Sequence, residues 1–447
     1  MDSNESSENT QRPSWLTDEY IAEILRKGED DSGIKVNNVD ITSYLGKGEN
    51  YASIIQKINI TYTDGKDHQK EKTFILKSMP HNPIMQRFVI EAKLYDKELH
   101  AYKKLIPAMA SLTEVPQISA QFYSTDREDI VILEDMTTKG FKMADRKKRM
   151  DLAHSILALK ALARFHGLSF AVVEREPSIV DHFQESMYSN RMKEMNSRFI
   201  PKMYGSLASL VETWVGFERF SEKIRSRIDG IFDQMEEIIS PKISAFNVLN
   251  HGDFWVNNML FRYNETQEPE EVCLIDLQLI RYGSPALDLQ YFFATSLADN
   301  VREKYEDILL EEYHKALSAT LRSVTLKPIT YSLEDLRHDF QEKAAFGFNM
   351  GCFVIGAVVA DSSEAIDLDS LTEESIEDGS ANPMEKMFLG KRFKDALQKL
   401  LLYYELKGSI IKHCQIHRSV TLKPITHSLE DLRHDFQEKL NLKKTKH

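Results

Sequence analysis

The chain has few cysteines and no excess of basic residues, and each shortage limits what it can be. Only three cysteines occur in 447 residues, Cys273, Cys352 and Cys414, and no two of them form a C-x-x-C pair. This argues against a disulfide framework or a zinc site and favours a reducing compartment. Lysine and arginine number 57 against 69 acidic residues, a net charge of −12, which argues against nucleic acid as a partner.

The sequence shows no clear pattern of a signal peptide or of a membrane-spanning segment. Residues 1–12 are polar and acidic, without a charged-then-apolar signal, and we expect them to be a disordered tail. The apolar run 344–360 is about as long as the shortest membrane-spanning helices. It contains Asn349 and three glycines, however, and is better interpreted as a buried helix. We expect a cytoplasmic, monomeric protein with no membrane partner.

What the sequence does contain is a kinase-type catalytic loop. Residues 251–258 read HGDFWVNN, and an apolar, strand-like segment then delivers Asp276. The H-x-D-x-x-x-x-N spacing predicts Asp253 as the catalytic base for an acceptor hydroxyl, and Asn258 and Asp276 as metal ligands. The pattern is short, and the alternative is a polar turn in which Asp253 only caps a neighbour. Apolar runs on both sides of the loop favour the catalytic interpretation.

The patterns around this loop predict an α+β, protein-kinase-like fold with two lobes. Strand-like segments at 39–45, 53–62 and 72–77 precede the loop, and helical patterns dominate after residue 137. Pro107 should end a helix over 85–105, and Pro201 should break the helical stretch 180–240. The predicted parts are a tail (1–12), a sheet lobe (13–136), a helical lobe (137–415) and an appended segment (416–447).

Two features of the sheet lobe predict contacts with nucleotide phosphates. The turn that contains Gly46 and Gly48, with Ser53 after it, would let backbone N–H groups approach the phosphates, although any hairpin can turn on glycines. Lys77 ends an apolar strand, where its charge needs a partner. The alternative is a solvent-facing lysine. In the kinase interpretation Lys77 pairs with a helix carboxylate, Glu98 or, as the alternative, Glu91.

The connection between the lobes and the segment after Asp276 complete the predicted site. Glu134, Asp135 and Met136 leave a strand and would present backbone groups to adenine. Asp288 is expected to brace the catalytic loop by accepting bonds from its backbone amides, or else to cap a helix. Only eleven residues separate Asp276 from Asp288 and no Ala-Pro-Glu follows, so the peptide-docking segment of protein kinases is missing. A small acceptor is therefore expected.

Taken together these motifs resemble the insect ecdysteroid kinase-like family, which is related to choline kinases and aminoglycoside phosphotransferases. The resemblance covers residues 15–415 and rests most firmly on the HGDFWVNN loop. It implies that ATP and Mg²⁺ serve as cofactors and that a small molecule with a hydroxyl group, an ecdysteroid or a foreign or dietary alcohol, is phosphorylated. The alternatives are a choline- or ethanolamine-type kinase and a catalytically silent nucleotide-binding relative.

The chain also repeats one of its own segments. Residues 322–343 and 418–439 are identical at 21 of 22 positions and differ only where Tyr331 becomes His427. Two identical helices cannot fill one niche in a lobe. We expect the first copy to pack into the helical lobe and residues 416–447 to be an appended duplicate that contributes neither stability nor activity.

Overall fold

The computed structural model describes residues 12–43, 52–114, 119–325, 328–364, 371–374 and 384–408. Residues 1–410 form one compact unit, and the description below concerns that unit. The expected tail at residues 1–11, the glycine turn with Gly46 and Gly48, and the appended duplicate 416–447 lie outside the described residues.

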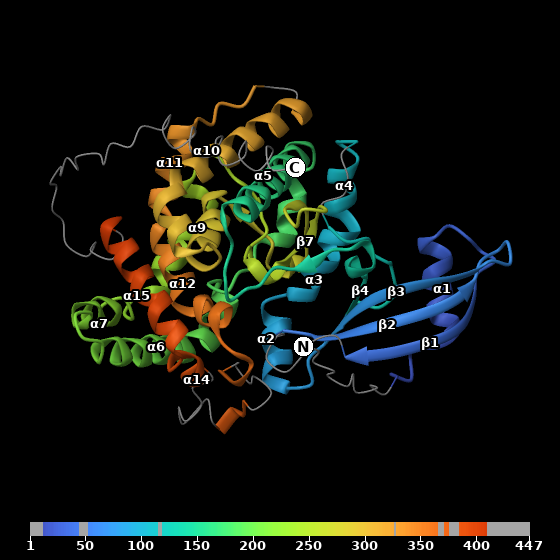
Figure 1. The fold of residues 1–447 in the computed structure, drawn as a ribbon, viewed down its shortest axis with the longest axis horizontal. Helices are drawn as coiled ribbons and strands as arrows, with labels where there is room; N and C mark the ends of the chain where they lie inside the picture. Colours follow the sequence, from blue (N-terminus) through green and yellow to red (C-terminus); the bar gives the residue numbers. More distant parts are fainter. Residues whose placement is uncertain are drawn as a thin grey trace. The chain divides into compact units, whose positions relative to one another are not determined.

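The first lobe is an antiparallel sheet with a helix on one face. Strands β1 (Lys35–Ser43), β2 (Ile54–Thr63), β3 (Gln69–Ser78) and β4 (Ile130–Glu134) pair in the order β1-β2-β3-β4. Helix α1 (Asp18–Gly28) lies against this sheet (Figure 1), with Thr17 as its N-cap. Alternate strand residues meet the apolar side of α1 in a small core. Its members include Ile21, Leu25, Ile58, Ile60, Phe74 and Leu76.

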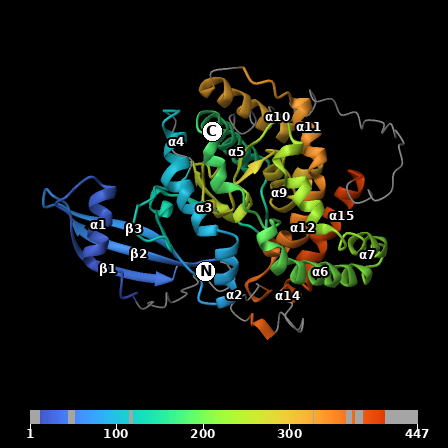
Figure 2. The same ribbon diagram turned by 180° about the vertical axis from the view of Figure 1, so that it is seen from behind.

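A chain of short helices lies between the sheet and the second lobe (Figures 1 and 2). They are α2 (Pro83–Glu91), α3 (Leu94–His100), a π-helical turn (Ala101–Leu105) and α4 (Ile106–Ala110). The prediction that Pro107 ends a continuous helix is wrong. The break comes earlier, at Lys93 with φ of +53°. Pro107 lies inside the helical run that passes directly from the π-helical turn into α4.

The second lobe is mainly helical and carries the larger core. The prediction that Pro201 breaks the helical stretch is wrong, because Pro201 lies inside α6. The carbonyl that loses its partner belongs to exposed Ser197, where water can replace the hydrogen bond. The helices are α5 (Leu152–Arg175), α6 (Asn190–Glu212), α7 (Glu218–Arg225), α8 (Ile231–Ile239), α9 (Ala286–Thr295), α10 (Asp299–Val324), α11 (Leu333–Glu342), α12 (Ala344–Val359), α14 (Glu385–Phe388) and α15 (Lys391–Leu406).

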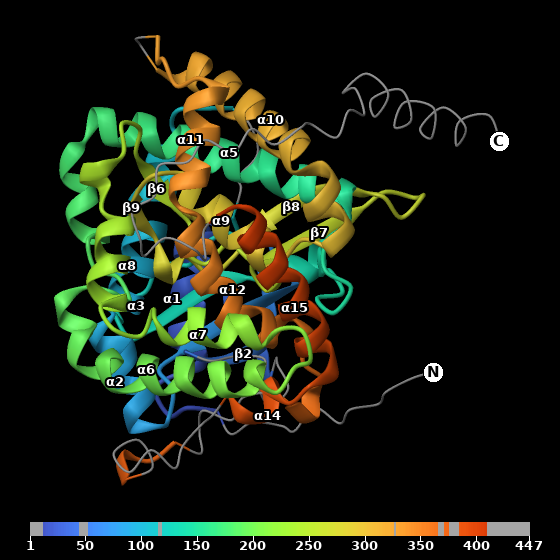
Figure 3. The ribbon, with the colours of Figure 1, turned by 90° about the vertical axis from the view of Figure 1, so that its left-hand side faces the viewer.

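Helices α5 and α12 form apolar parts of this core, and Figure 3 shows α5 running beside α10. By length and composition α5 is the one helix among the described residues that could cross a membrane alone, and 61% of its apolar window is buried inside the protein. Helices α11 and α12 meet the same criteria only as a pair bent by 56°. The run 344–360 is thus a largely buried helix, as predicted.

The first copy of the duplicated segment packs into this lobe. It forms the end of α10 and all of α11, which Ser332 and Asp335 cap reciprocally. Tyr331, the one residue that differs between the copies, is buried, stacks on Phe246 at 4.4 Å and donates a hydrogen bond to Asp339. Tyr331 therefore makes packing and hydrogen-bond contacts for the first copy at the one position where the second copy has a different residue.

Short strands in the second lobe frame the catalytic loop. The loop runs from β6 (Val248–Asn250) to β7 (Met259–Tyr263), and β8 (Pro269–Leu274) ends just before Asp276. Strand β6 pairs with β9 (Arg281–Gly283), and β7 lies between β8 and the short β5 (Lys142–Met143). An antiparallel sheet lobe followed by a helical lobe that holds this loop confirms the predicted α+β, protein-kinase-like fold.

Candidate active site

The catalytic loop turns sharply at a position that only glycine can fill. Gly252 has φ of +82°, and a Cβ built there would lie 1.8 Å from the carbonyl oxygen of Leu279. Both the left-handed backbone and the close approach of another chain segment exclude a side chain. Gly252 thus lets the loop pass directly against the segment that follows Asp276.

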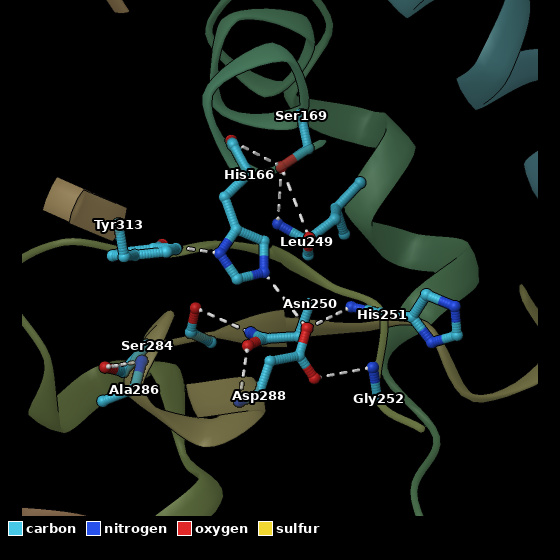
Figure 4. A network of polar contacts seen from close by, with 11 residues as sticks. His166, Ser169, Leu249, Asn250, His251, Gly252, Ser284, Ala286, Asp288 and Tyr313 are labelled. Atoms are coloured by element: carbon cyan, nitrogen blue, oxygen red, sulfur yellow. Dashed lines mark hydrogen bonds and ion pairs between the residues drawn. The ribbon is translucent and has the colours of Figure 1, made fainter. Parts of the chain in front are cut away.

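Asp288 holds this turn in place by hydrogen bonds to its backbone, as predicted. Its two carboxylate oxygens accept hydrogen bonds from the backbone N–H groups of His251 (2.6 Å) and Gly252 (2.9 Å). The ring of His166 contacts the same carboxylate at 3.1 Å and is held in turn by the hydroxyl of Tyr313 at 2.7 Å. Figure 4 shows this network, in which Asp288 faces both the loop backbone and the His166 ring. The side chains of Asp288, His166 and Tyr313 are buried, so the loop backbone is held rigidly.

Asp253 projects from this braced loop and is held at both carboxylate oxygens. The amide nitrogen of Asn258 donates to Oδ2 at 2.8 Å, and the hydroxyl of Tyr291 donates to Oδ1 at 2.6 Å. Burial, followed by the neighbouring charge of Asp276, raises the pKa of Asp253 to about 6, although both hydrogen bonds act in the opposite direction. Asp253 is therefore a carboxylate that ionises close to neutral pH.

Asn258 and Asp276 supply oxygen atoms next to Asp253. The backbone N–H of Ile275 donates to the carbonyl of Asn258 at 3.1 Å, which joins the loop to the segment carrying Asp276. Asp276 has φ of +66°, a conformation that costs about 1 kcal/mol in a residue other than glycine. Strain of this kind is found preferentially at functional sites.

This donor set fits a magnesium ion. No group of three or more His, Cys, Asp or Glu side chains among the described residues could hold a metal alone. Mg²⁺, however, is commonly held by only one or two carboxylates together with substrate phosphates. The amide nitrogen of Asn258 is used on Asp253, so its amide oxygen is the atom available to a cation. Asn257 adds a buried amide oxygen that has no hydrogen-bond partner.

A buried lysine links the two lobes at this site. Lys77 Nζ contacts both carboxylate oxygens of Glu98, at 2.9 and 2.6 Å, and Asp276 Oδ1 at 2.9 Å. Burial lowers the pKa of Lys77, but the two carboxylates outweigh it and the net pKa is raised, so the lysine stays charged. The open choice of carboxylate falls on Glu98, because Glu91 lies at the surface against Arg191.

The remaining sequence-predicted residues are placed less uniformly. Ser53 is buried and does not line the cavity, whereas its neighbour Ala52 does. The side chain of Glu134 accepts a hydrogen bond from Lys139, and that of Asp135 accepts one from the backbone N–H of Thr137. The backbone N–H groups of Glu134 and Asp135 donate to the carbonyls of Gln121 and Thr73. Met136 begins a 3₁₀ turn (Met136–Lys139), where a backbone N–H has no partner within the helix.

Most of the predicted residues line one cavity of about 190 Å³. Its walls are apolar on the sheet side, with Ile75 and Leu133, and on the helical side, with Leu260 and Ile275. An apolar slot with a few convergent polar groups is typical of a small-molecule site. The predicted residues that line it are Lys77, Glu134, Asp135, Met136, Asp253, Asn258 and Asp276.

The sequence interpretation missed several residues at this site, among them Tyr291 and Arg146. Tyr291, on α9, contacts Asp253 directly. It follows Asp288 by three positions, so the two lie on one face of the helix, and that spacing was the available signal. Arg146 lines the cavity, and its NH1 donates to carbonyls at the end of α12, those of Ala357, Val358 and Ala360. No local pattern indicates this long-range contact.

Comparison with known sequences agrees with the motifs. A model of the ecdysteroid kinase-like family matches residues 47–326, which is more than half of the chain. The chain belongs to the ecdysteroid kinase-like family. None of the curated proteins compared with it matches.

Solved structures with some likeness are distant in sequence. One is a choline kinase from Cryptosporidium parvum Iowa II, 13% identical, with 88% of this chain and 97% of that chain covered and a TM-score of 0.44. An ethanolamine kinase from Plasmodium vivax is 12% identical, with coverages of 83% and 84% and a TM-score of 0.37. A choline/ethanolamine kinase family protein from Mesorhizobium loti is 11% identical, with coverages of 81% and 92% and a TM-score of 0.34.

Proposed function

We propose that this family member is an ATP- and Mg²⁺-dependent kinase that phosphorylates a hydroxyl group of a small molecule. The observation that carries the proposal is the meeting of Asp253, Asn258, Asp276 and Lys77 in one cavity, with Glu98 fixing the lysine. A kinase site consists of these groups: a base, two metal-binding side chains and a lysine–glutamate pair. Membership of the ecdysteroid kinase-like family supports the same conclusion.

Asp253 is the base in this proposal. With a pKa of about 6 it is ionised at neutral pH and still basic enough to accept a proton from the acceptor hydroxyl. Its carboxylate orients that hydroxyl toward the phosphoryl group. The rigid backbone held by Asp288 limits the freedom of the base, and positioning of this kind contributes most of the catalysis in phosphoryl transfer.

The other residues hold the nucleotide. Lys77 would bind the phosphates of ATP and Glu98 would keep Lys77 in place, while Met136 would offer its backbone to adenine. Asn258 and Asp276 would hold Mg²⁺. When bound, the metal neutralises the negative charge of the phosphates. The glycine turn, with Gly46 and Gly48, remains our predicted cover for the phosphates.

The acceptor is proposed to be an ecdysteroid or a foreign or dietary alcohol, and the protein to act as a cytoplasmic monomer. Helix α9 begins at Ala286, so residues 277–285 leave no room for a long peptide-docking segment. A cavity that reaches Asp253 between the lobes suits a small acceptor. Cys273 and Cys352 are free and buried, in keeping with a reducing compartment.

The test is ATP consumption by purified protein with Mg²⁺ and a panel of acceptors. The panel contains a steroid alcohol, a phenol, a sugar and the amino alcohols choline and ethanolamine, and Asp253→Asn is the control. We expect turnover that depends on the acceptor and falls about a hundredfold or more in the variant, while binding of Mg·ATP persists. Stimulation by choline alone would reassign the acceptor to the amino alcohols. Failure of the wild-type protein to bind Mg·ATP would overturn the proposal.

A further inference from the structure

The hydroxyl of Tyr291 donates a short hydrogen bond to Oδ1 of Asp253, at 2.6 Å. Only 5% of Tyr291 is exposed, and its ring belongs to the main core of the helical lobe. Burying a tyrosine hydroxyl without a hydrogen-bond partner costs free energy, so a buried tyrosine needs a partner within reach. Here the partner is the carboxylate assigned as base.

Tyr291 and Asn258 together fix both ends of this carboxylate. Asn258 Nδ2 donates to Oδ2 at 2.8 Å and to the backbone carbonyl of Asp253 at 3.0 Å. The terminal torsion of an aspartate is otherwise broad, so one anchor would leave the carboxylate free to turn about the other. A carboxylate offers about four acceptor positions. Each oxygen therefore keeps a lone pair to which an acceptor O–H can donate.

The helix that carries Tyr291 is itself tied to the catalytic loop. Asp288, one turn earlier on α9, binds the backbone N–H groups of His251 and Gly252. Every residue of α9 is buried. The same rigid helix thus holds both the loop backbone, through Asp288, and the side chain of Asp253, through Tyr291. Tyr291 cannot move without moving Asp288.

We propose that Tyr291 is a positioning residue for phosphoryl transfer, whose hydroxyl holds Asp253 in the orientation that receives the acceptor's proton. This inference rests on the proposed function. The tyrosine keeps its own proton throughout. The acceptor's proton passes to the free lone pair of Asp253 as the acceptor oxygen bonds to the γ-phosphorus of ATP, and the bond from that phosphorus to the oxygen bridging to the β-phosphate breaks, so that ADP leaves. The hydrogen bond from Tyr291 also lowers the pKa of Asp253, against burial and the charge of Asp276.

The decisive variant is Tyr291→Phe, which removes only the hydroxyl. We expect kcat to fall about tenfold or more, as for loss of a hydrogen bond to a charged group, with KM for ATP unchanged within about twofold. The acid limb of the pH–rate profile should move to higher pH, because Asp253 loses a bond that favours its ionised form. The matched control is Tyr404→Phe, which removes another buried hydroxyl bonded to α9, at Gln290.

Several outcomes separate a positioning role from a structural one. A kcat and acid limb that match those of Tyr404→Phe would overturn the proposal. In an Asp253→Asn background, Tyr291→Phe should lower the residual rate no further, since the tyrosine acts through Asp253. A further tenfold loss in that background would also overturn it.

A readout that needs no turnover keeps this test apart from that of the proposed function. Urea unfolding is compared at one pH for wild type, Tyr291→Phe, Asp253→Ala and the double variant, and the same cycle is made with Tyr404→Phe. Because the Tyr291 hydroxyl and Asp253 Oδ1 lie 2.6 Å apart, the losses of stability from Tyr291→Phe and Asp253→Ala should not add. The losses from Tyr404→Phe, whose hydroxyl bonds Gln290, and Asp253→Ala should add. Additive losses for Tyr291→Phe and Asp253→Ala would refute the coupling even if no acceptor were turned over.

Discussion

The raised pKa of Asp253 makes an unusual prediction: replacing this proposed base should stabilise the protein increasingly, relative to wild type, as the pH rises. The carboxyl ionises at a pKa of about 6 in the folded state, against 3.8 in the unfolded chain. An acid whose folded pKa is raised contributes stability below its unfolded pKa, and that contribution is lost as the pH rises through the folded value. Wild type should thus lose stability between about pH 4 and pH 7, whereas Asp253→Asn does not titrate.

The size of the effect follows from the shift of about two pKa units. At about 1.4 kcal/mol per unit, the full linkage is about 3 kcal/mol. About 2 kcal/mol of this falls between pH 4.5 and 7.5. Because Asp253 is only half-buried, solvent screening reduces the figure, and we expect the stability gap between Asp253→Asn and wild type to grow by about 1–2 kcal/mol over that range.

The assay is urea unfolding followed by circular dichroism at one-unit steps from pH 4.5 to 7.5. The quantity of interest is the change in the gap with pH, since an asparagine next to Asn258 adds a constant offset of its own. Exposed Asp96→Asn, on α3, is the control for removing one negative charge. A gap that stays constant with pH, or one that shrinks as the pH rises, would refute the electrostatic picture of the site.

Three further predictions test the frame around the base. Gly252→Ala should abolish turnover and destabilise the protein by more than about 2 kcal/mol, because the new Cβ would clash with Leu279. The control is Gly216→Ala, which has φ of +84° but open space around it and so shows the backbone cost alone. Equal losses of stability in urea unfolding would argue against the clash. Glu98→Gln should weaken Mg·ATP binding measured by calorimetry about tenfold or more and cost about 2–4 kcal/mol of stability, whereas Glu91→Gln at the surface should change neither. Deleting residues 416–447 should leave the melting temperature and turnover unchanged, while Phe340→Ala in the first copy should cost about 3–5 kcal/mol; a sharp loss on deletion would contradict the view that the duplicate is dispensable.

The sequence indicated the parts of the site whose spacing is local. The interval from Asp253 to Asn258 is set within one loop, and a charged Lys77 at the end of an apolar strand needs a partner wherever the strand lies. The choice between Glu98 and Glu91 depended on how a helix is rotated against the sheet. That rotation depends on the break at Lys93, whose left-handed backbone is not predicted by the conformational preference of lysine.

Errors came where a local rule met a tertiary context. Proline was expected to stop helices at Pro107 and Pro201, but the helical backbone continues through both. At Pro201 the carbonyl left without a partner is exposed, so water can satisfy it. Tyr291 was overlooked because its partner is 38 residues away in the chain. Periodicity identifies a tyrosine on a buried helix as core, and only the fold shows that its hydroxyl reaches the base.

The arrangement around α9 also explains how a kinase-type loop is held when only eleven residues separate Asp276 from Asp288. Asp288 holds the loop backbone, Tyr291 holds the side chain of Asp253, and Gly252 lets the loop touch the segment after Asp276. These contacts are made by groups within the core and need no long ordered segment outside it. The orientation of Asp253 is set by the packing of α9. We therefore expect substitutions in the core against α9, far from any ligand, to lower kcat before they weaken nucleotide binding.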